Sequence, residues 1–234
     1  MQHHSHMPTT ITKGSNCITL IELLTINPTN SETVIEHIQR TARDVMMRRT
    51  GFVSLNLHRS QDHHYLCNYV QWENAASLDQ ALHHRDFVHH YQRYQGLLDE
   101  VDSDLYDVIY TDDRTSQGMT TIRDDFDGGT FINFMTTTPE KQPKLVEFVI
   151  GNDAQTFSGA PGYRAANFHR SHNGLHVINY SQWNRPQDFL DAINNMFHVP
   201  NLTMEQANHL ASQGAQGVGA TNFRFYDVVY RLHA

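Results

Sequence analysis

Short strand-like runs and helical spacing alternate along the first part of the chain. Residues 17–26 are rich in Ile, Leu and Thr, which is typical of a β-strand. Between residues 34 and 46, apolar side chains recur three or four positions apart, which predicts an amphipathic helix. We expect Asn30 or Ser31 to cap this helix and Gly51 to stop it.

Two more strands, a second helix and a last strand complete the pattern. The strands are expected at 52–58 and 65–72, the helix after its cap Asn74, and the last strand at 106–110. The order βαββαβ is that of the split-βαβ or ferredoxin-like fold. In this α+β arrangement, both helices lie on one face of a four-stranded antiparallel sheet.

The chain contains this pattern twice. Residues 51–60 align with 162–171, and the pentapeptide at 68 aligns with the one at 179, since 162 − 51 = 111 and 179 − 68 = 111. The last-strand pattern recurs at an offset of 120, which predicts about nine extra residues late in the second copy. A repeat of this length matches one small domain, so the pattern indicates a tandem duplication.

The duplication predicts how the chain is divided. Each sheet would leave one apolar face bare, so we expect the two sheets to pack together as a pseudo-dimer within one chain. Pairing of whole chains as a homodimer stays open. The predicted segments are a flexible tail at 1–14, a first domain at 15–111, a linker at 112–128 and a second domain at 129–234.

Charge and composition narrow the class of protein. A formal charge of −8 argues against nucleic acid as a partner, because phosphate backbones require clustered Lys and Arg. No apolar run reaches the roughly 20 residues that cross a bilayer, and the start lacks the apolar core of a secretory signal. With Cys17 and Cys67 as the only cysteines, a reduced cytoplasmic setting is expected. The cluster His3, His4 and His6 resembles a purification tag.

The third strand of each copy carries candidate chemistry. A strand period of two places Asn68 and Trp72 on one face, and Tyr69 and Gln71 on the other. If the first face meets the helices, an amide and an indole N–H project into an apolar layer, which favours a small-molecule site. The alternative is that both are satisfied structural residues. We expect Tyr69, Gln71 and their repeats to form hydrogen bonds where the sheets meet.

The segment Asn-Tyr-x-Gln-Trp and the Ala-Leu-His-His-x-x-Phe run at 81–87 resemble the antibiotic biosynthesis monooxygenase family, across both copies. The resemblance implies a dimeric α/β-barrel. In one branch it implies cofactor-independent oxygenases that convert a phenolic anthrone to a quinone with dioxygen. Its proposed catalytic residues correspond to Asn68, Trp72, Asn179 and Trp183, and a substrate-binding first-strand Asn corresponds to Asn133, where the first copy has Glu22.

Several further residues are candidates for substrate binding. His58-Arg59 and His169-Arg170 occur in both copies, where a His could act as a base and an Arg could hold a phenolate; a strand-end pair facing water is the preferred interpretation. His83 and His84 lie on the second helix.

Three functions remain open at this stage. The preferred hypothesis is an enzyme, a cofactor-independent monooxygenase that acts on a small aromatic substrate with dioxygen. The sequence lacks Gly-x-Gly-x-x-Gly, P-loop and Cys-x-x-Cys motifs, and no metal is expected. Some relatives degrade haem through a second-helix His, which makes haem the alternative cofactor. A non-catalytic small-molecule-binding protein is the third hypothesis.

Overall fold

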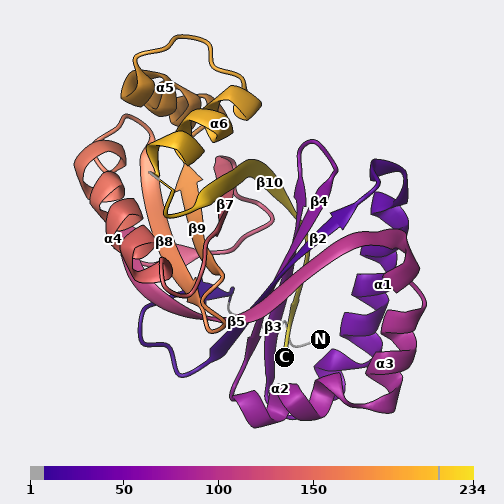
Figure 1. The fold of residues 1–234 in the computed structure, drawn as a ribbon. Helices are drawn as coiled ribbons and strands as arrows, with labels where there is room; N and C mark the ends of the chain where they lie inside the picture. Colours follow the sequence, from indigo (N-terminus) through magenta and orange to yellow (C-terminus); the bar gives the residue numbers. More distant parts are fainter. Residues whose placement is uncertain (1–7, 216) are drawn as a thin grey trace.

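Eight strands of the protein close into one barrel with the helices outside it (Figure 1). A computed structural model describes residues 8–215 and 217–234; the tag-like His3, His4 and His6 lie outside the described residues. Around the barrel the strand order is β10-β3-β4-β2-β5-β8-β9-β7. Within the described ranges, no helix is both long and apolar enough to span a bilayer.

The first unit has the predicted βαββαβ order, with its second helix divided in two. His83 ends one helix, and His84 caps the next by accepting a hydrogen bond from the Asp86 amide at 3.2 Å. The first helix also ends before Gly51, which instead lies at positive φ in the turn that enters the next strand. The elements are β2 (Ile18–Ile26), α1 (Ser31–Asp44), β3 (Phe52–Ser60), β4 (Tyr65–Trp72), α2 (Ala75–Leu82), α3 (Arg85–Gln92) and β5 (Leu98–Asp113), with 3₁₀ turns at Pro28–Asn30, Met46–Arg48 and Gln95–Leu97.

The second unit repeats this order with an added helix. The elements are β7 (Gly129–Thr136), α4 (Gln142–Asn152), a π-helical turn (Asp153–Phe157), β8 (Tyr163–Ser171), β9 (His176–Trp183), α5 (Pro186–Phe197), α6 (Met204–Gly214) and β10 (Ala220–His233). The extra residues predicted late in this copy precede β10, where α6 packs against that strand.

The long fourth strands join the two sheets into the barrel. β5 pairs with β2 along its first part and with β8 along its second part, and a bulge separates Val108 from Tyr110. β10 pairs in the same way with β7 and then β3, with a bulge between Val228 and Tyr230. A bulge bends and twists a strand, which lets it pass from one sheet to the other. The expected pseudo-dimer is therefore a single closed barrel.

The barrel interior is the contact predicted between the two sheets. It contains buried side chains from both units, including Ile21, Tyr69, Ile132 and Tyr180. The opposite faces of the strands carry two separate apolar layers beneath the helices of each unit. Trp72 belongs to one of these layers and Trp183 to the other, as the strand period predicted.

Two stretches expected to be a tail and a linker contribute a small ribbon. β1 (Thr10–Ile11) pairs antiparallel with β6 (Thr120–Thr121), and Ile11 is buried. The side chains of Gln71 and Gln182 donate to main-chain oxygens of this ribbon at 3.2 and 3.0 Å. The end of the expected tail is thus paired with the expected linker, and buried glutamine side chains of the barrel strands donate to this ribbon. The division at 15–111 and 129–234 stays a prediction.

Candidate functional site

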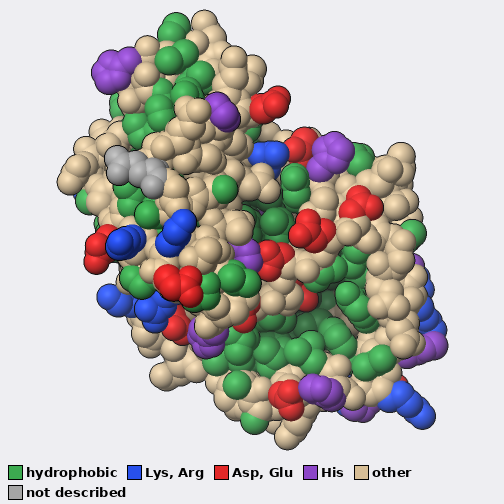
Figure 2. Space-filling view, in the orientation of Figure 1, with side chains coloured by type: hydrophobic (Ala, Val, Ile, Leu, Met, Phe, Trp, Pro, Cys, Tyr) green, Lys and Arg blue, Asp and Glu red, His purple; other side chains and the backbone are tan. Residues whose placement is uncertain are grey.

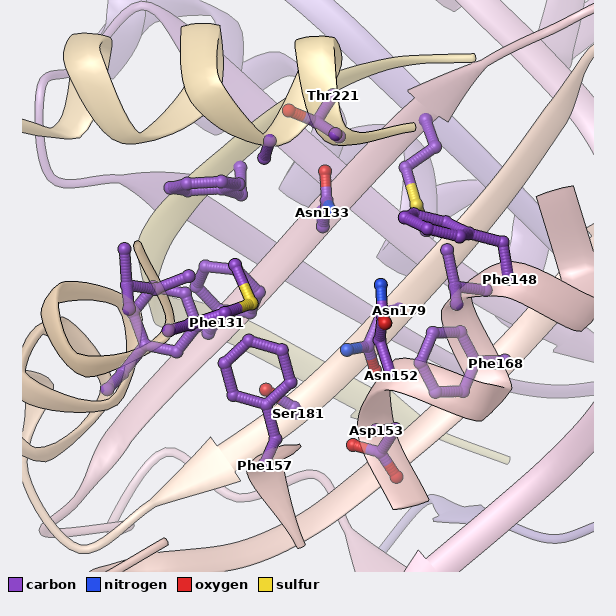
Figure 3. Close-up of a pocket in the computed structure, with 18 of the residues that line it drawn as sticks. Phe131, Asn133, Phe148, Asn152, Asp153, Phe157, Phe168, Asn179, Ser181 and Thr221 are labelled. Atoms are coloured by element: carbon purple, nitrogen blue, oxygen red, sulfur yellow. The ribbon is translucent and has the colours of Figure 1, made fainter. Parts of the chain in front are cut away.

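An apolar cavity of about 200 Å³ lies in the second unit, between its sheet and helices α4, α5 and α6. Figure 3 shows amide groups in its centre, surrounded by phenyl rings. A cavity with mostly apolar walls and a few convergent polar groups is the usual form of a small-molecule site. Its aromatic lining residues are Phe131, Phe148, Phe157, Tyr163, Phe168, Trp183, Phe189, Phe197 and Phe223.

Two carboxamides from neighbouring strands project into this cavity. Asn133 on β7 and Asn179 on β9 are direct cross-strand partners, so their side chains point to the same face of the sheet. The Asn133 Oδ1 accepts a hydrogen bond from the Asn222 amide at 3.2 Å. The Asn179 Oδ1 is buried and has no hydrogen-bond partner. An unpaired buried acceptor is unfavourable, which makes Asn179 a candidate contact for a ligand donor.

The indole of Trp183 contributes differently from the expectation. It lines the cavity, but its Nε1 already donates to the Ser181 Oγ at 3.1 Å. This N–H is therefore satisfied within the protein, as the alternative interpretation expected, and a catalytic role of Trp183 stays a prediction. Ser181 also lines the cavity, and a serine hydroxyl that accepts one hydrogen bond still has its own proton to donate. The donor available to a ligand at this position is therefore the serine hydroxyl.

A buried carboxyl group, not predicted from the sequence, completes the polar lining. Asp153 is 2% exposed, and the Tyr163 hydroxyl lies 3.4 and 3.2 Å from its two carboxylate oxygens. Burial raises the pKa of Asp153 to about 6, although the hydrogen bond from Tyr163 acts in the opposite direction. Asn152, next to it in the chain, lies between Asn179 and Asp153 in Figure 3. One feature of the sequence pointed to this polar group: at the repeat offset of 111, Tyr163 stands where the first copy has Phe52.

At the corresponding position of the first unit, the Asn68 Oδ1 is also buried without a hydrogen-bond partner, but the amide nitrogen is bound to a carboxylate. Asn68 donates from Nδ2 to the Glu22 carboxylate at 2.9 Å, and Ser103 donates to the same carboxylate at 3.4 Å. Burial raises the pKa of Glu22. Trp72 is fully buried, and its Nε1 has no hydrogen-bond partner. Figure 2 shows apolar side chains gathered in an open hollow on the face of this unit, with acidic and histidine side chains near its rim.

The two repeated histidines lie inside the barrel, which corrects the expectation that they face water. His58 Nε2 is 3.1 Å from the Tyr180 hydroxyl, and His169 Nε2 is 3.2 Å from the Tyr69 hydroxyl. Both histidines are 0% exposed, and burial lowers the pKa of each to about 4. Neither lines the cavity, because strand alternation turns them toward the opposite face of the sheet. The predicted role of Tyr69 and Tyr180 at the contact between sheets is confirmed.

The other predicted binding residues also lie away from the cavity. Arg59 pairs with Glu32 of α1, and Arg170 lies 3.4 Å from Asp107 of β5. His83 is exposed, and His84 serves as the helix cap described above. Long side chains near strand ends and at helix termini reach solvent, where they form ordinary surface ion pairs and caps.

The haem alternative requires a histidine at the ligand site. Among the residues that the structure describes, none of those lining the cavity is a histidine, and no three His, Cys, Asp or Glu side chains are grouped to hold a metal ion. The second-helix histidines on which the alternative rested belong to the first unit, where His83 is exposed and His84 caps α3. The second-unit cavity therefore lacks a histidine ligand for haem among its described lining residues, and the haem hypothesis for the first unit stays a prediction.

Comparisons with known proteins agree with this architecture. The antibiotic biosynthesis monooxygenase family model matches residues 17–94. Tetracenomycin-F1 monooxygenase of Streptomyces glaucescens is 35% identical over 71 residues, which cover 30% of this chain and 63% of that protein. A crystal structure of an anthrone oxidase-like protein superposes with a TM-score of 0.78 at 22% identity, covering 97% of both chains. A candidate monooxygenase of Fusobacterium nucleatum gives 0.57 at 8% identity, over 93% of this chain and 94% of its own.

The sequence match and the fold match cover different extents of the chain. The family model covers β2 through α3, the part that holds Asn68 and Trp72. The structural likeness to the anthrone oxidase-like protein extends over both units and, at its level of identity, shows the fold. The chain therefore consists of two units of the same fold, and residues 17–94 of the first unit match the model of the antibiotic biosynthesis monooxygenase family.

Proposed function

We propose that the protein is a cofactor-independent monooxygenase that oxidises a phenolic, anthrone-like polycyclic aromatic to a quinone with dioxygen. The reaction would belong to aromatic polyketide or other secondary-metabolite biosynthesis, and its site would be the second-unit cavity. The observation that carries the proposal is the pair Asn133 and Asn179 inside a wall of aromatic rings. The cytoplasmic setting and a homodimer of whole chains stay predictions.

The walls and the amides suit the two ends of such a substrate. Flat aromatic rings pack favourably against the edges and faces of phenylalanine side chains, so the lining favours a planar polycyclic ligand. The Asn179 oxygen can accept a phenolic hydroxyl, and the Ser181 hydroxyl can donate to a ring carbonyl. The relative from Streptomyces glaucescens is named a monooxygenase of tetracenomycin F1, which supports the same substrate class.

The chemistry requires stabilisation of an anion in a dry site. Loss of a proton from an anthrone methylene gives a delocalised, phenolate-like anion. Neutral hydrogen-bond donors in a water-poor cavity stabilise such charge where it develops. The anion can pass one electron to dioxygen, and the resulting radicals combine to form a carbon–oxygen bond. Loss of water from the peroxide then gives the ketone, so one oxygen atom enters the product and the other leaves as water.

Oxygen uptake tests this proposal. Purified protein without added metal or flavin should consume dioxygen with a polyhydroxylated anthrone and form the quinone. Asn133→Ala and Asn179→Ala should each lower kcat/KM by about 100-fold, the usual cost of one group that stabilises a developing charge. Asn173→Ala, in the exposed β8–β9 turn, is the matched control and should keep the wild-type rate.

Other results would favour the alternatives. A Soret band in the purified protein would support the haem hypothesis. A well-folded protein that binds the anthrone but consumes no oxygen would support a binding protein.

A further inference from the structure

We propose that Asp153, held by Tyr163, is the general base of the second-unit cavity and removes the proton from a carbon acid or phenol bound there. This inference rests on the proposed function for its substrate class. It adds a residue that neither the repeat nor the strand-three motif contains, because Asp153 lies on the helical side of the cavity.

The position of Asp153 gives its carboxylate access to a ligand. It lies where α4 ends and a π-helical turn begins, and it lines the same cavity as Asn179 and Trp183. Figure 3 shows it on one side of the amide groups, with Asn152 between Asp153 and Asn179. A π-helical turn inserts an extra residue into a helix and is frequent at functional sites. Asp153 is the first residue of this turn and is buried.

The fold itself does not require a carboxyl group at this position. At the offset of 111, Asp153 corresponds to Ala42 and Tyr163 to Phe52. Ala42 and Phe52 are both buried in the apolar layer of the first unit. That layer therefore packs without a carboxyl or hydroxyl group at these two positions. Burial of a carboxyl group costs free energy, and the first unit forms the same layer without one. The Asp–Tyr pair is therefore a feature of the unit that has the cavity.

The groups around Asp153 keep it basic. It is at the C-terminal end of α4, where the helix dipole disfavours an anion. Burial raises its pKa to about 6, the bond from Tyr163 lowers the pKa, the charge of Asp112 raises it and the charge of Arg114 lowers it. A base whose pKa lies near the working pH is effective, because it is mostly ionised yet still accepts a proton readily.

The proton transfers balance within the proposed reaction. Asp153 takes one methylene proton and leaves the substrate anion, which transfers an electron to dioxygen and then forms the carbon–oxygen bond of a peroxide anion. The carboxyl returns its proton to the terminal peroxide oxygen. The carboxylate then takes the second methylene proton as the O–O bond breaks and the C=O bond forms. That proton and the departing hydroxide leave as water, so dioxygen is the only oxidant used.

Hydrogen–deuterium exchange separates this inference from the proposed function. Without dioxygen, wild-type protein in D₂O should catalyse exchange of the methylene protons of a polyhydroxylated anthrone. Asp153→Asn, which keeps the size of the side chain, should lower that exchange by about 100-fold or more, the range of general-base catalysis. The matched control is Asp191→Asn on the exposed side of α5, which should exchange at the wild-type rate.

The pH dependence adds a readout that a merely structural role would not move. The exchange rate should rise with pH through about 6 in the wild type, because the carboxylate is the active form. In Tyr163→Phe this inflection should move to higher pH, because the hydrogen bond from Tyr163 holds the pKa of Asp153 down and its removal lets the pKa rise. The assignment of Asp153 as the general base would be overturned if Asp153→Asn exchanged at the wild-type rate. It would also be overturned if the wild type showed no exchange. Exchange without oxygen uptake would overturn only the monooxygenase.

Discussion

At the scale of single residues, two asparagines of the second unit lie on opposite faces of one sheet. Asn179 and Asn167 each have a buried carbonyl oxygen without a hydrogen-bond partner, but Asn167, on the barrel side of the same unit, also donates to Thr120 at 2.8 Å and to the Tyr180 carbonyl at 3.1 Å. Both are asparagines on adjacent strands, and strand alternation alone decides which layer each one enters. The sequence therefore predicted the face of Asn179 but not that its oxygen lacks a partner.

This contrast predicts opposite effects of one substitution. Asn179→Leu should raise the free energy of unfolding by about 1 kcal/mol, because it removes an unsatisfied buried acceptor, and should lower oxygenation. Asn167→Leu should lower the free energy of unfolding by roughly 1–3 kcal/mol, because its hydrogen-bond partners lose their donor. Urea denaturation of both variants measures the difference. A loss of stability in Asn179→Leu equal to that in Asn167→Leu would show that Asn179 is a structural residue.

At the scale of elements, helix boundaries were harder to predict than helix positions. Apolar spacing located the helices, but a polar pair at 83–84 divides one of them, since His84 caps α3. Helix α6, which covers the cavity, was predicted only as an insertion. Its N-terminus has a capping box in which Thr203 and Gln206 exchange hydrogen bonds at 3.1 and 3.0 Å. Ala211 and Gly214 of this helix line the cavity.

The cap of α6 should therefore affect both stability and ligand binding. Thr203→Ala should cost about 1 kcal/mol of unfolding free energy, the usual effect of losing a side-chain cap, and should raise KM because α6 frays over the cavity. Asn74→Ala removes a similar cap from α2, where Asn74 accepts from the Ser77 amide at 2.9 Å. It should cost a similar amount of stability and leave KM unchanged. An equal rise in KM for both variants would show a general effect of destabilisation.

At the scale of the whole molecule, the duplicated sequence predicted two sheets in contact, and the structure closes them into one barrel. Repeats and strand alternation are local patterns, so they located the strands and their faces. Closure depends on the bulges in the second parts of β5 and β10, and no turn-forming residue in the sequence predicts them. The buried pairs His58–Tyr180 and Tyr69–His169 follow from that closure, because each joins side chains from different units. The His-Arg motif at the end of each strand did not predict that the two histidines are buried.

These central histidines predict an acid-sensitive barrel. Burial lowers the pKa of His58 and His169 from an ordinary 6.5 to about 4, so between these values the unfolded chain binds more protons than the folded one. Their contribution to stability is complete above pH 6.5 and is lost as pH falls toward 4. At roughly 1.4 kcal/mol per pH unit, each accounts for on the order of 3 kcal/mol.

Measurement of unfolding free energy across this range tests the assignment. The wild type should lose stability steeply between pH 6.5 and pH 4, and His58→Gln with His169→Gln should flatten that slope while lowering stability at pH 7. Asp153 acts in the opposite direction, because its raised pKa means that the folded state gains stability as pH falls from about 6. His63→Gln, in the exposed β3–β4 turn, should leave the slope unchanged. An unaltered slope in the double variant would assign the acid sensitivity to groups outside the barrel, since the remaining titrations would then suffice to explain it.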